Sequence, residues 1–202
     1  DLSLAGQIIT MMLFQCGGLG IITFSVFFFH LMGRSVSFKG REIVQSTFLH
    51  TPRKDFQIIL KSVLLSTLII ESFGTVLLFV RFSQDFSPGQ AFYHSIYNAI
   101  SAFNNCGYSL FSDNLIQYQS DVIVNITIMG LIVLGGIGFI VQHEVLSRMR
   151  NTRNRLSLHT KIVLATTGIL VVGGAVLFYL FEKNNIIRDA SWQSKVLISL
   201  FQ

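Results

Sequence analysis

Four long apolar runs constrain the fold of this chain more than any other feature. They occupy residues 4–32, 56–82, 122–142 and 162–181, and the last two contain no charged residue. An α-helix needs about 20 mostly apolar residues to cross the hydrocarbon core of a bilayer. Charged residues make up 12% of the chain, whereas a soluble domain contains about 25%. We therefore predict an all-α integral membrane protein rather than a soluble helical domain.

Basic residues are concentrated in two of the segments between these runs, 33–55 and 147–160. The second run ends with one arginine, Arg81, and the stretch from there to the third run contains three aspartates and no further arginine or lysine. The positive-inside rule places both basic segments in the cytoplasm and residues 83–120 outside. This topology accounts for the positive net charge, so nucleic-acid binding is not expected. A fifth apolar segment, 91–103, is too short to cross the membrane and is predicted to be a re-entrant helix.

Two pairs of apolar runs match each other at fixed offsets, which indicates an internal repeat. An offset of 100 places run 56–82 on run 162–181, with Gly74 on Gly174. An offset of 118 places Gly-Gly-Leu-Gly at 17–20 on Gly-Gly-Ile-Gly at 135–138. Phe92 also matches Trp192. Both copies of each run have the same predicted orientation, so the repeat is parallel. Its unit is an outer helix, a re-entrant pore helix and an inner helix.

The repeat divides the chain into five predicted segments: the inner helix of a first repeat (1–32), a cytoplasmic loop (33–55), a complete second repeat (56–146), a second cytoplasmic loop (147–160), and the outer helix and start of the pore helix of a third repeat (161–202). The second repeat has four predicted parts: an outer helix (56–82), a pore helix (91–103), a filter loop (104–109) and an inner helix (120–146). The filter loop is the part that would carry the chemistry.

This loop reads Asn-Asn-Cys-Gly-Tyr-Ser and can be laid over the potassium-channel filter Thr-Val-Gly-Tyr-Gly, with its glycine at the first glycine of the filter. In such a filter, backbone carbonyls replace the water around a dehydrated K⁺, and glycine supplies the positive φ that this needs. The string alone fits an ordinary external turn equally well, but the short helix before it and the repeat around it favour a pore. The predicted K⁺-binding residues, acting through their backbone, are Asn104, Asn105, Cys106, Gly107 and Tyr108.

The order of these segments, the two glycine-rich inner helices and the sequence Phe-Asn-Asn-Cys-Gly-Tyr at 103–108 resemble the Ktr/Trk/HKT superfamily of potassium transporters. The sequence Arg-Leu-Ser-Leu-His-Thr-Lys at 155–161 resembles its bacterial Ktr branch. The resemblance implies four such units around one pore, each with a single-glycine filter loop, in the plasma membrane of a bacterium. It makes this chain a fragment centred on the second repeat. The other three filters and the gating loop of the family then lie outside the fragment.

The resemblance also implies which ion is transported and which proteins are partners. K⁺ is the transported ion, with Na⁺ as an activating or coupled ion, and no cofactor is expected in this chain. The expected partners are a second copy of the protein, forming a homodimer, and a cytosolic nucleotide-binding RCK ring that gates the pore. The filter departs from the family pattern in having Cys106 and Tyr108 where alanine and phenylalanine are more usual. Coordination by the backbone would tolerate both changes.

Four other groups of residues have two interpretations each. Glu71 is an ionisable group at membrane depth, which marks a functional candidate, but a buried polar contact between the outer helix and the pore helix is the favoured interpretation. The glycines at 17, 18, 20, 135, 136 and 138 favour close helix packing over a hinge. Cys16 and Cys106 are expected to be small buried residues rather than a disulfide. The five histidines lie too far apart for a metal site.

Two other functional classes were weighed against a pore. A membrane enzyme would carry its catalytic residues in the cytoplasmic loops, but these loops are basic and lack paired carboxylates or a nucleophile–base set. A membrane scaffold would leave the re-entrant segment and its glycine turn without a purpose. The sequence therefore predicts a protein that is not an enzyme and that carries ions across the membrane.

Overall fold

The computed structural model describes residues 2–19, 56–150, 155–188 and 191–202. Within these ranges every regular element is a helix: α1 (Leu4–Gly18), α4 (Phe56–Phe82), α5 (Pro88–Phe103), the short 3₁₀ helix η1 (Ile116–Tyr118), α6 (Val122–Gly136), α7 (Phe139–Arg150), α8 (Leu158–Glu182) and α9 (Trp192–Phe201). The predicted all-α class is confirmed for this part of the chain. The predicted loop 33–55 lies outside the described residues.

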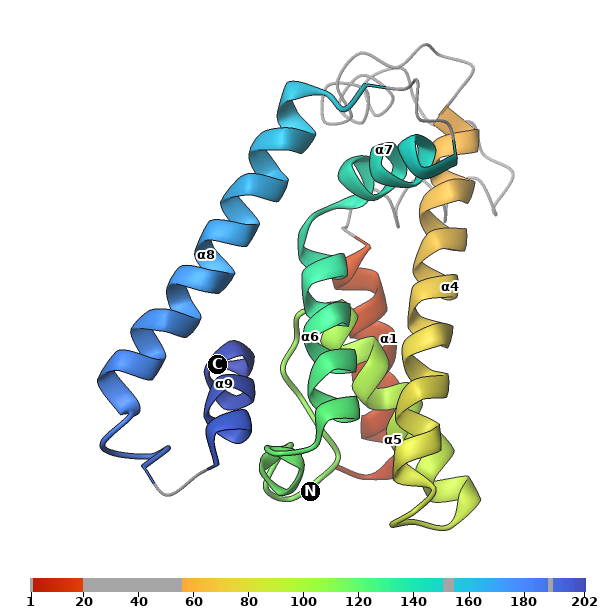
Figure 1. The fold of residues 1–202 in the computed structure, drawn as a ribbon. Helices are drawn as coiled ribbons and strands as arrows, with labels where there is room; N and C mark the ends of the chain where they lie inside the picture. Colours follow the sequence, from red (N-terminus) through yellow and green to blue (C-terminus); the bar gives the residue numbers. More distant parts are fainter. Residues whose placement is uncertain (1, 20–55, 151–154, 189–190) are drawn as a thin grey trace.

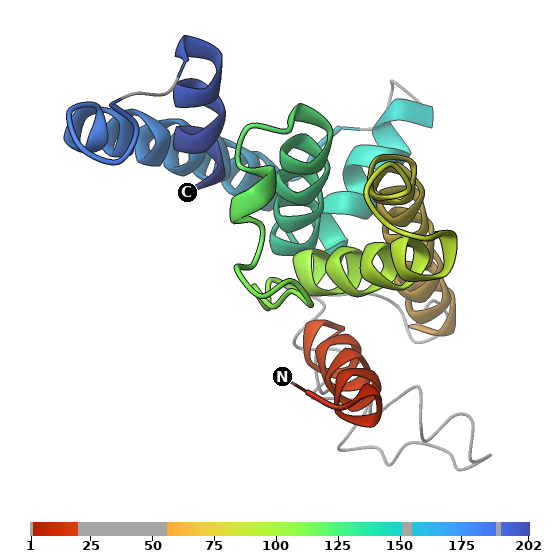
Figure 2. The ribbon, with the colours of Figure 1, turned by 90° about the horizontal axis from the view of Figure 1, so that it is seen from below.

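Helices α4, α5 and α6 pack together, and α1 lies on the other side of α5 (Figures 1 and 2). The pair α8 and α9 forms a second group beside them (Figure 1). Helices α4 and α8 run in the same direction, and α1 and α6 both run in the opposite direction (Figure 1). These are the directions that a parallel repeat of outer and inner helices requires.

Two helices, α4 and α8, are long and apolar enough to cross a membrane. The bounds of α4 coincide with the predicted outer helix 56–82. Leu65, Leu68 and Phe73 of α4 are about 60% exposed or more, and a bilayer would cover these side chains. The described part of the first run, α1, is a shorter apolar helix. Of the four predicted spans, the described helices therefore account for two in full and one in part, and the bent pair α6 and α7 passes the same test for the remaining one.

The segment predicted as the inner helix 120–146 forms two helices in the structure. Helix α6 ends at Gly136, α7 begins at Phe139, and the two are bent by 106°. Gly138 lies between them with φ +80°, a left-handed conformation that ends many helices and that glycine adopts without steric cost. The side-chain amide of Gln142 donates to the carbonyl of Leu134 across the bend, which satisfies an acceptor that the end of α6 exposes.

The pore helix α5 begins three residues earlier than predicted, at Pro88. Ser87 is its N-cap, and proline suits the first position of a helix because its missing N–H has no helical acceptor there. In α9 the N-cap is Ser191, so α5 and α9 match at an offset of 104 instead of 100. The connection between α8 and α9 is therefore four residues longer than the one between α4 and α5. Phe92 and Trp192, which the sequence predicts to be equivalent, make the same kind of contact. The ring of Phe92 meets an aromatic ring of α4 edge to face, and the ring of Trp192 meets an aromatic ring of α8 in the same way.

Candidate functional site

The loop that follows α5 has a backbone that ordinary residues adopt only with strain. Asn105 has φ 55° and Gly107 has φ 74°. A Cβ at Gly107 would meet nothing within 4 Å, so conformation, and not space, calls for glycine at this position. Residues with positive φ are what a loop needs if successive carbonyls are to face one side.

Ser101 of α5 holds this loop in place. Its backbone carbonyl accepts from the N–H of Cys106 at 2.9 Å, and its hydroxyl accepts from the N–H of Tyr108, also at 2.9 Å. Two carbonyls of the loop take part in hydrogen bonds of their own. The carbonyl of Asn104 accepts from the thiol of Cys106 at 3.5 Å, and that of Gly107 accepts from the side-chain amide of Asn114 at 3.2 Å. The five predicted filter residues thus form one compact turn at the end of α5.

Two glycines of the inner helices lie directly against the start of the loop. A Cβ on Gly135 of α6 would lie 1.7 Å from the carbonyl oxygen of Phe103. A Cβ on Gly18 of α1 would lie 1.6 Å from the side-chain oxygen of Asn104. A side chain at Gly135 would clash with backbone, and one at Gly18 would have to displace the Asn104 side chain, so close packing is the correct interpretation at both. It does not extend to all six glycines: a Cβ on Gly17 would meet nothing within 4 Å among the described residues, and one on Gly136 would be 3.9 Å from its nearest neighbour. Gly138 forms the bend after α6, and Gly20 lies outside the described residues.

Glu71 of α4 reaches the same point. It is 5% exposed, and its two carboxylate oxygens accept hydrogen bonds from two amide side chains. Gln15 of α1 donates at 2.6 Å, and Asn104 donates at 3.4 Å. Asn104 also donates to Gln15 at 2.6 Å. The favoured interpretation of Glu71 as a buried contact between the outer helix and the pore-helix segment is therefore confirmed. Gln15 was not singled out from the sequence, although it is a polar residue in an apolar run.

One face of α1 follows α5 along its length. Gln7 accepts from the hydroxyl of Tyr93 at 2.9 Å, and the hydroxyls of Thr10 and Tyr97 lie 3.2 Å apart. Further along, Phe14 contacts Tyr97 edge to face and stacks on Tyr108 of the loop. The spacing of 7, 10, 14 and 15 in α1 is that of one helix face. The first inner helix therefore packs against both the pore helix and the loop that follows it.

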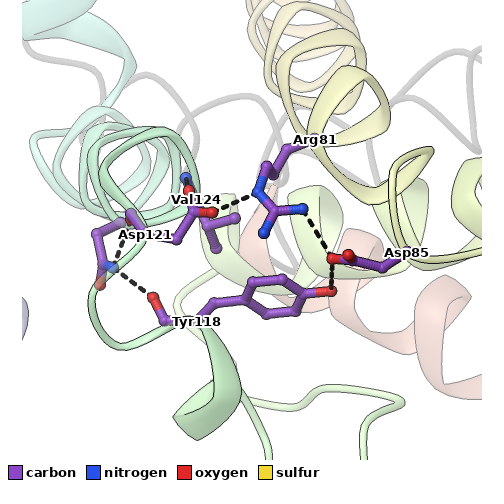
Figure 3. Close-up of polar contacts among 6 residues, drawn as sticks. Arg81, Asp85, Tyr118, Asp121 and Val124 are labelled. Atoms are coloured by element: carbon purple, nitrogen blue, oxygen red, sulfur yellow. Dashed lines mark hydrogen bonds and ion pairs between the residues drawn. The ribbon is translucent and has the colours of Figure 1, made fainter.

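The chain that returns from the loop to α6 is fastened by a charged network (Figure 3). Arg81 at the end of α4 forms ion pairs with Asp85, at 2.7 Å, and with Asp121. Asp121 is also the N-cap of α6 and accepts from the N–H of Val124. The hydroxyl of Tyr118 donates to Asp85 at 3.0 Å, and burial together with this carboxylate raises the pKa of Tyr118 to about 12. The phenol therefore remains a neutral donor at physiological pH.

An aromatic cluster supports the same return segment from the other side. Phe111 stacks on Phe86 and on His94, with ring centroids 5.6 Å and 4.9 Å apart. It also meets Phe82 edge to face. Burial lowers the pKa of His94, which suits a neutral ring inside this stack. Neither the charged network nor this cluster was predicted from the sequence.

In the described part of the chain, neither a metal site nor a disulfide lies at the loop. Among the residues that the structure describes, no group of three or more His, Cys, Asp or Glu side chains is arranged to hold a metal ion. Cys16 and Cys106 are both free and partly buried. Burial raises the pKa of the Cys106 thiol, so this thiol is protonated at physiological pH.

Comparison with known proteins identifies the family. The model of the TrkH family, described as "Cation transport protein", matches residues 1–197. The chain belongs to the TrkH family. This TrkH chain is similar to the Ktr system potassium uptake protein B of Vibrio alginolyticus, with 33% identity over 91% of the chain. It is also similar to the protein of that name from Bacillus subtilis, with 36% identity over 89% of the chain, and to the potassium/sodium uptake protein NtpJ of Enterococcus hirae, with 31% identity over 90%.

The TrkH chain spans about 40% of the length of each of these relatives. Their names denote uptake proteins rather than enzymes, which agrees with the prediction from the basic loops. The family and the apolar helices together confirm the predicted bacterial membrane protein. Two of the names also assign the relatives to a Ktr system.

Proposed function

We propose that this chain forms part of the pore of a potassium uptake protein, and that the loop 104–108 is one K⁺ filter of that pore. The observation that carries the proposal is the backbone of the loop at the end of α5, where Gly107 has φ 74° although a side chain there would meet no atom within 4 Å. Coordination of K⁺ by backbone carbonyls requires a loop with positive φ angles, and glycine adopts such angles without steric cost. A glycine of this kind after a short buried helix therefore fits a K⁺ filter. The potassium uptake activity in the names of the relatives supports the same ion.

In this proposal the ion is coordinated by backbone oxygens of Asn104, Asn105, Cys106, Gly107 and Tyr108. The C-terminal end of α5 points its partial negative charge toward the loop, which favours a cation there. Asn114 holds the carbonyl of Gly107 at 3.2 Å, so an ion at that oxygen shares it with an amide donor. Na⁺ enters as a coupled or activating ion, an idea that the name of the Enterococcus hirae relative supports.

The topology and partners are part of the proposal. The first residues of α4 and α8 and the whole of α7 lie at one end of the molecule (Figure 1), and this end is placed in the cytoplasm by the positive-inside rule. A nucleotide-binding RCK ring docks on this basic face and gates the pore, and two copies of the transporter form a homodimer. We place seven basic residues near the ring: Arg34, Lys39, Arg41, Arg148, Arg150, Arg153 and Arg155. Of these, Arg148 and Arg155 have their side chains among the described residues.

Replacing Gly107 with serine in the complete transporter tests the filter. A Cβ at φ 74° strains the backbone by about 1 kcal/mol or more, so the carbonyls shift and discrimination between K⁺ and Na⁺ falls. The measurement is the ratio of K⁺ to Na⁺ uptake by purified protein in liposomes. Gly89→Ser is the matched control, because a Cβ at Gly89 also meets nothing within 4 Å but its φ is not positive. An unchanged ratio in Gly107→Ser would show that the loop is not a filter.

A further inference from the structure

Three helices meet at the first residue of the candidate filter. Asn104 is the C-cap of α5, with φ −85° and ψ 7°. Its side-chain nitrogen donates to the carbonyl of Ile100 within α5 at 2.8 Å and to Gln15 of α1 at 2.6 Å. A third and longer contact, to Glu71 of α4 at 3.4 Å, shares one of the two amide hydrogens with these bonds. The bond to Ile100 is local and ties Asn104 only to its own helix. The bonds to Gln15 and Glu71 tie it to an inner helix and to an outer helix.

Glu71 is the centre of this arrangement. Its second oxygen accepts from Gln15 at 2.6 Å, so the carboxylate bridges two amides that also bond to each other. A buried carboxylate is costly unless its oxygens are hydrogen-bonded. Here the donors that compensate the carboxylate are Asn104, the first residue of the candidate filter, and Gln15, which also bonds to Asn104. Any loss of the carboxylate therefore acts directly on Asn104.

The opposite side of the Asn104 amide is closed by packing. Among the described residues its oxygen is buried without a hydrogen-bond partner, and the backbone of Gly18 lies so close that a Cβ there would be 1.6 Å from this oxygen. A buried unpaired amide oxygen costs free energy, so the amide keeps its orientation because its nitrogen is well bonded. Without the acceptors on Glu71 and Gln15, rotation of the amide would lower this cost. Such a rotation would move the residue that begins the loop.

We propose that Glu71 is a positioning residue for ion selectivity, whose carboxylate fixes the start of the filter through Asn104 and Gln15. This inference rests on the proposed function of the loop. Glu71 makes no contact with the ion in this scheme. It acts because discrimination between K⁺ and Na⁺ depends on where the backbone oxygens are held.

The internal repeat shows that an outer helix does not need this carboxylate to form. At an offset of 100, the residue of α8 that corresponds to Glu71 is Val171, which is 40% exposed. Helix α8 is nevertheless regular from Leu158 to Glu182. The carboxylate is therefore a feature of the second repeat, where it reaches the loop.

The test compares Glu71→Ala and Glu71→Gln in the complete transporter, purified and reconstituted in liposomes. Removing a charged hydrogen-bond acceptor is expected to lower the ratio of K⁺ to Na⁺ uptake roughly tenfold in Glu71→Ala. Glutamine keeps an acceptor and the side-chain shape, so Glu71→Gln should recover most of the ratio. The ratio is independent of how much protein folds, which separates positioning from simple stability. Glu182→Ala, at the end of α8, is the matched carboxylate control and should leave the ratio unchanged.

A double variant sharpens the test. Gln15→Ala should lower the ratio in the same direction, and Gln15→Ala combined with Glu71→Ala should be little worse than Glu71→Ala alone, because both act through Asn104. An unchanged ratio in Glu71→Ala overturns the inference, as does a loss in Glu71→Gln equal to that in Glu71→Ala, which would assign the effect to charge. If Gly107→Ser changes the ratio while Glu71→Ala does not, this inference fails and the filter stands. If Gly107→Ser has no effect, the proposed function itself fails.

Discussion

Helices α4, α5 and α6 and the pair α8 and α9 follow the same repeat, but they differ in what connects them to other helices. In the first group, Gly74 of α4 packs against Leu131 of α6 so closely that a Cβ would come within 2.7 Å of it. The glycine at the corresponding position of α8 is Gly174. Glu71 and Arg81 of α4 correspond to Val171 and Phe181 of α8.

The features that the two groups share lie within the pairs α4 and α5 in the first group and α8 and α9 in the second. Ser87 and Ser191 are the N-caps of α5 and α9, and in each helix pair an aromatic ring of the outer helix meets a ring of the re-entrant helix edge to face. The features that differ are the two charged residues of α4, Glu71 and Arg81, which α8 lacks at the corresponding positions. The repeat therefore sets the helical frame, whereas the polar contacts made by Glu71 and Arg81 depend on residues that α8 does not share.

The largest effect is expected at Gly135, the glycine of α6 that lies against the end of α5. Its Cβ would lie 1.7 Å from a backbone oxygen, which no side-chain movement can relieve. Gly135→Ala should cost about 3 kcal/mol or more and abolish uptake, as measured by the melting temperature of the purified transporter and by K⁺ uptake. Gly130→Ala in the same helix is the control, because a Cβ there meets nothing within 4 Å. A fully active Gly135→Ala transporter would mean that α5 and α6 are not packed as described.

A smaller effect is expected when the end of α4 is made like the end of α8. Arg81→Phe removes both ion pairs, with Asp85 and with Asp121, and leaves two carboxylates without their cation. Hydrogen bonds to charged groups contribute about 1.5–3 kcal/mol each where they are partly buried, so the melting temperature should fall measurably. Lys183→Phe, which removes an exposed cation at the end of α8, should change it little. Equal melting temperatures for the two variants would show that the network in Figure 3 does not stabilise the second repeat.

The smallest effect tests what the two groups share. Ser95 of α5 and Ser199 of α9 are both buried, and each donates to the carbonyl four residues earlier at 2.7 Å. Ser95→Ala and Ser199→Ala should each cost about 0.5–1.5 kcal/mol and to the same extent, as measured by thermal unfolding of the purified transporter. A cost at Ser95 several times that at Ser199 would mean that the two pore helices are not equivalent even in their local structure.

Features that depend on short stretches of sequence could be predicted. The bounds of α4 follow from an apolar run with charged residues before it, and the candidate filter loop follows from a glycine after a short apolar helix. Contacts between distant segments could not be predicted. Gln15 and Asn104 are 89 residues apart, and Arg81 and Asp121 are 40 apart, so nothing in their local sequence pairs them. The bend at Gly138 was missed because a glycine in an apolar run is compatible with close packing as well as with the end of a helix.

The bend after Gly136 also affects how the bilayer fits around the protein. Helix α6 has 15 residues, and at 1.5 Å per residue it is about 22 Å long, whereas the hydrocarbon core is about 30 Å thick. Helix α4, with 27 residues, is about 40 Å long on the same scale. One helix is therefore shorter than the membrane and its neighbour is longer. A helix longer than the hydrocarbon core is accommodated by tilting or by local thickening of the bilayer, and a shorter one by thinning of the bilayer or by its flanking residues.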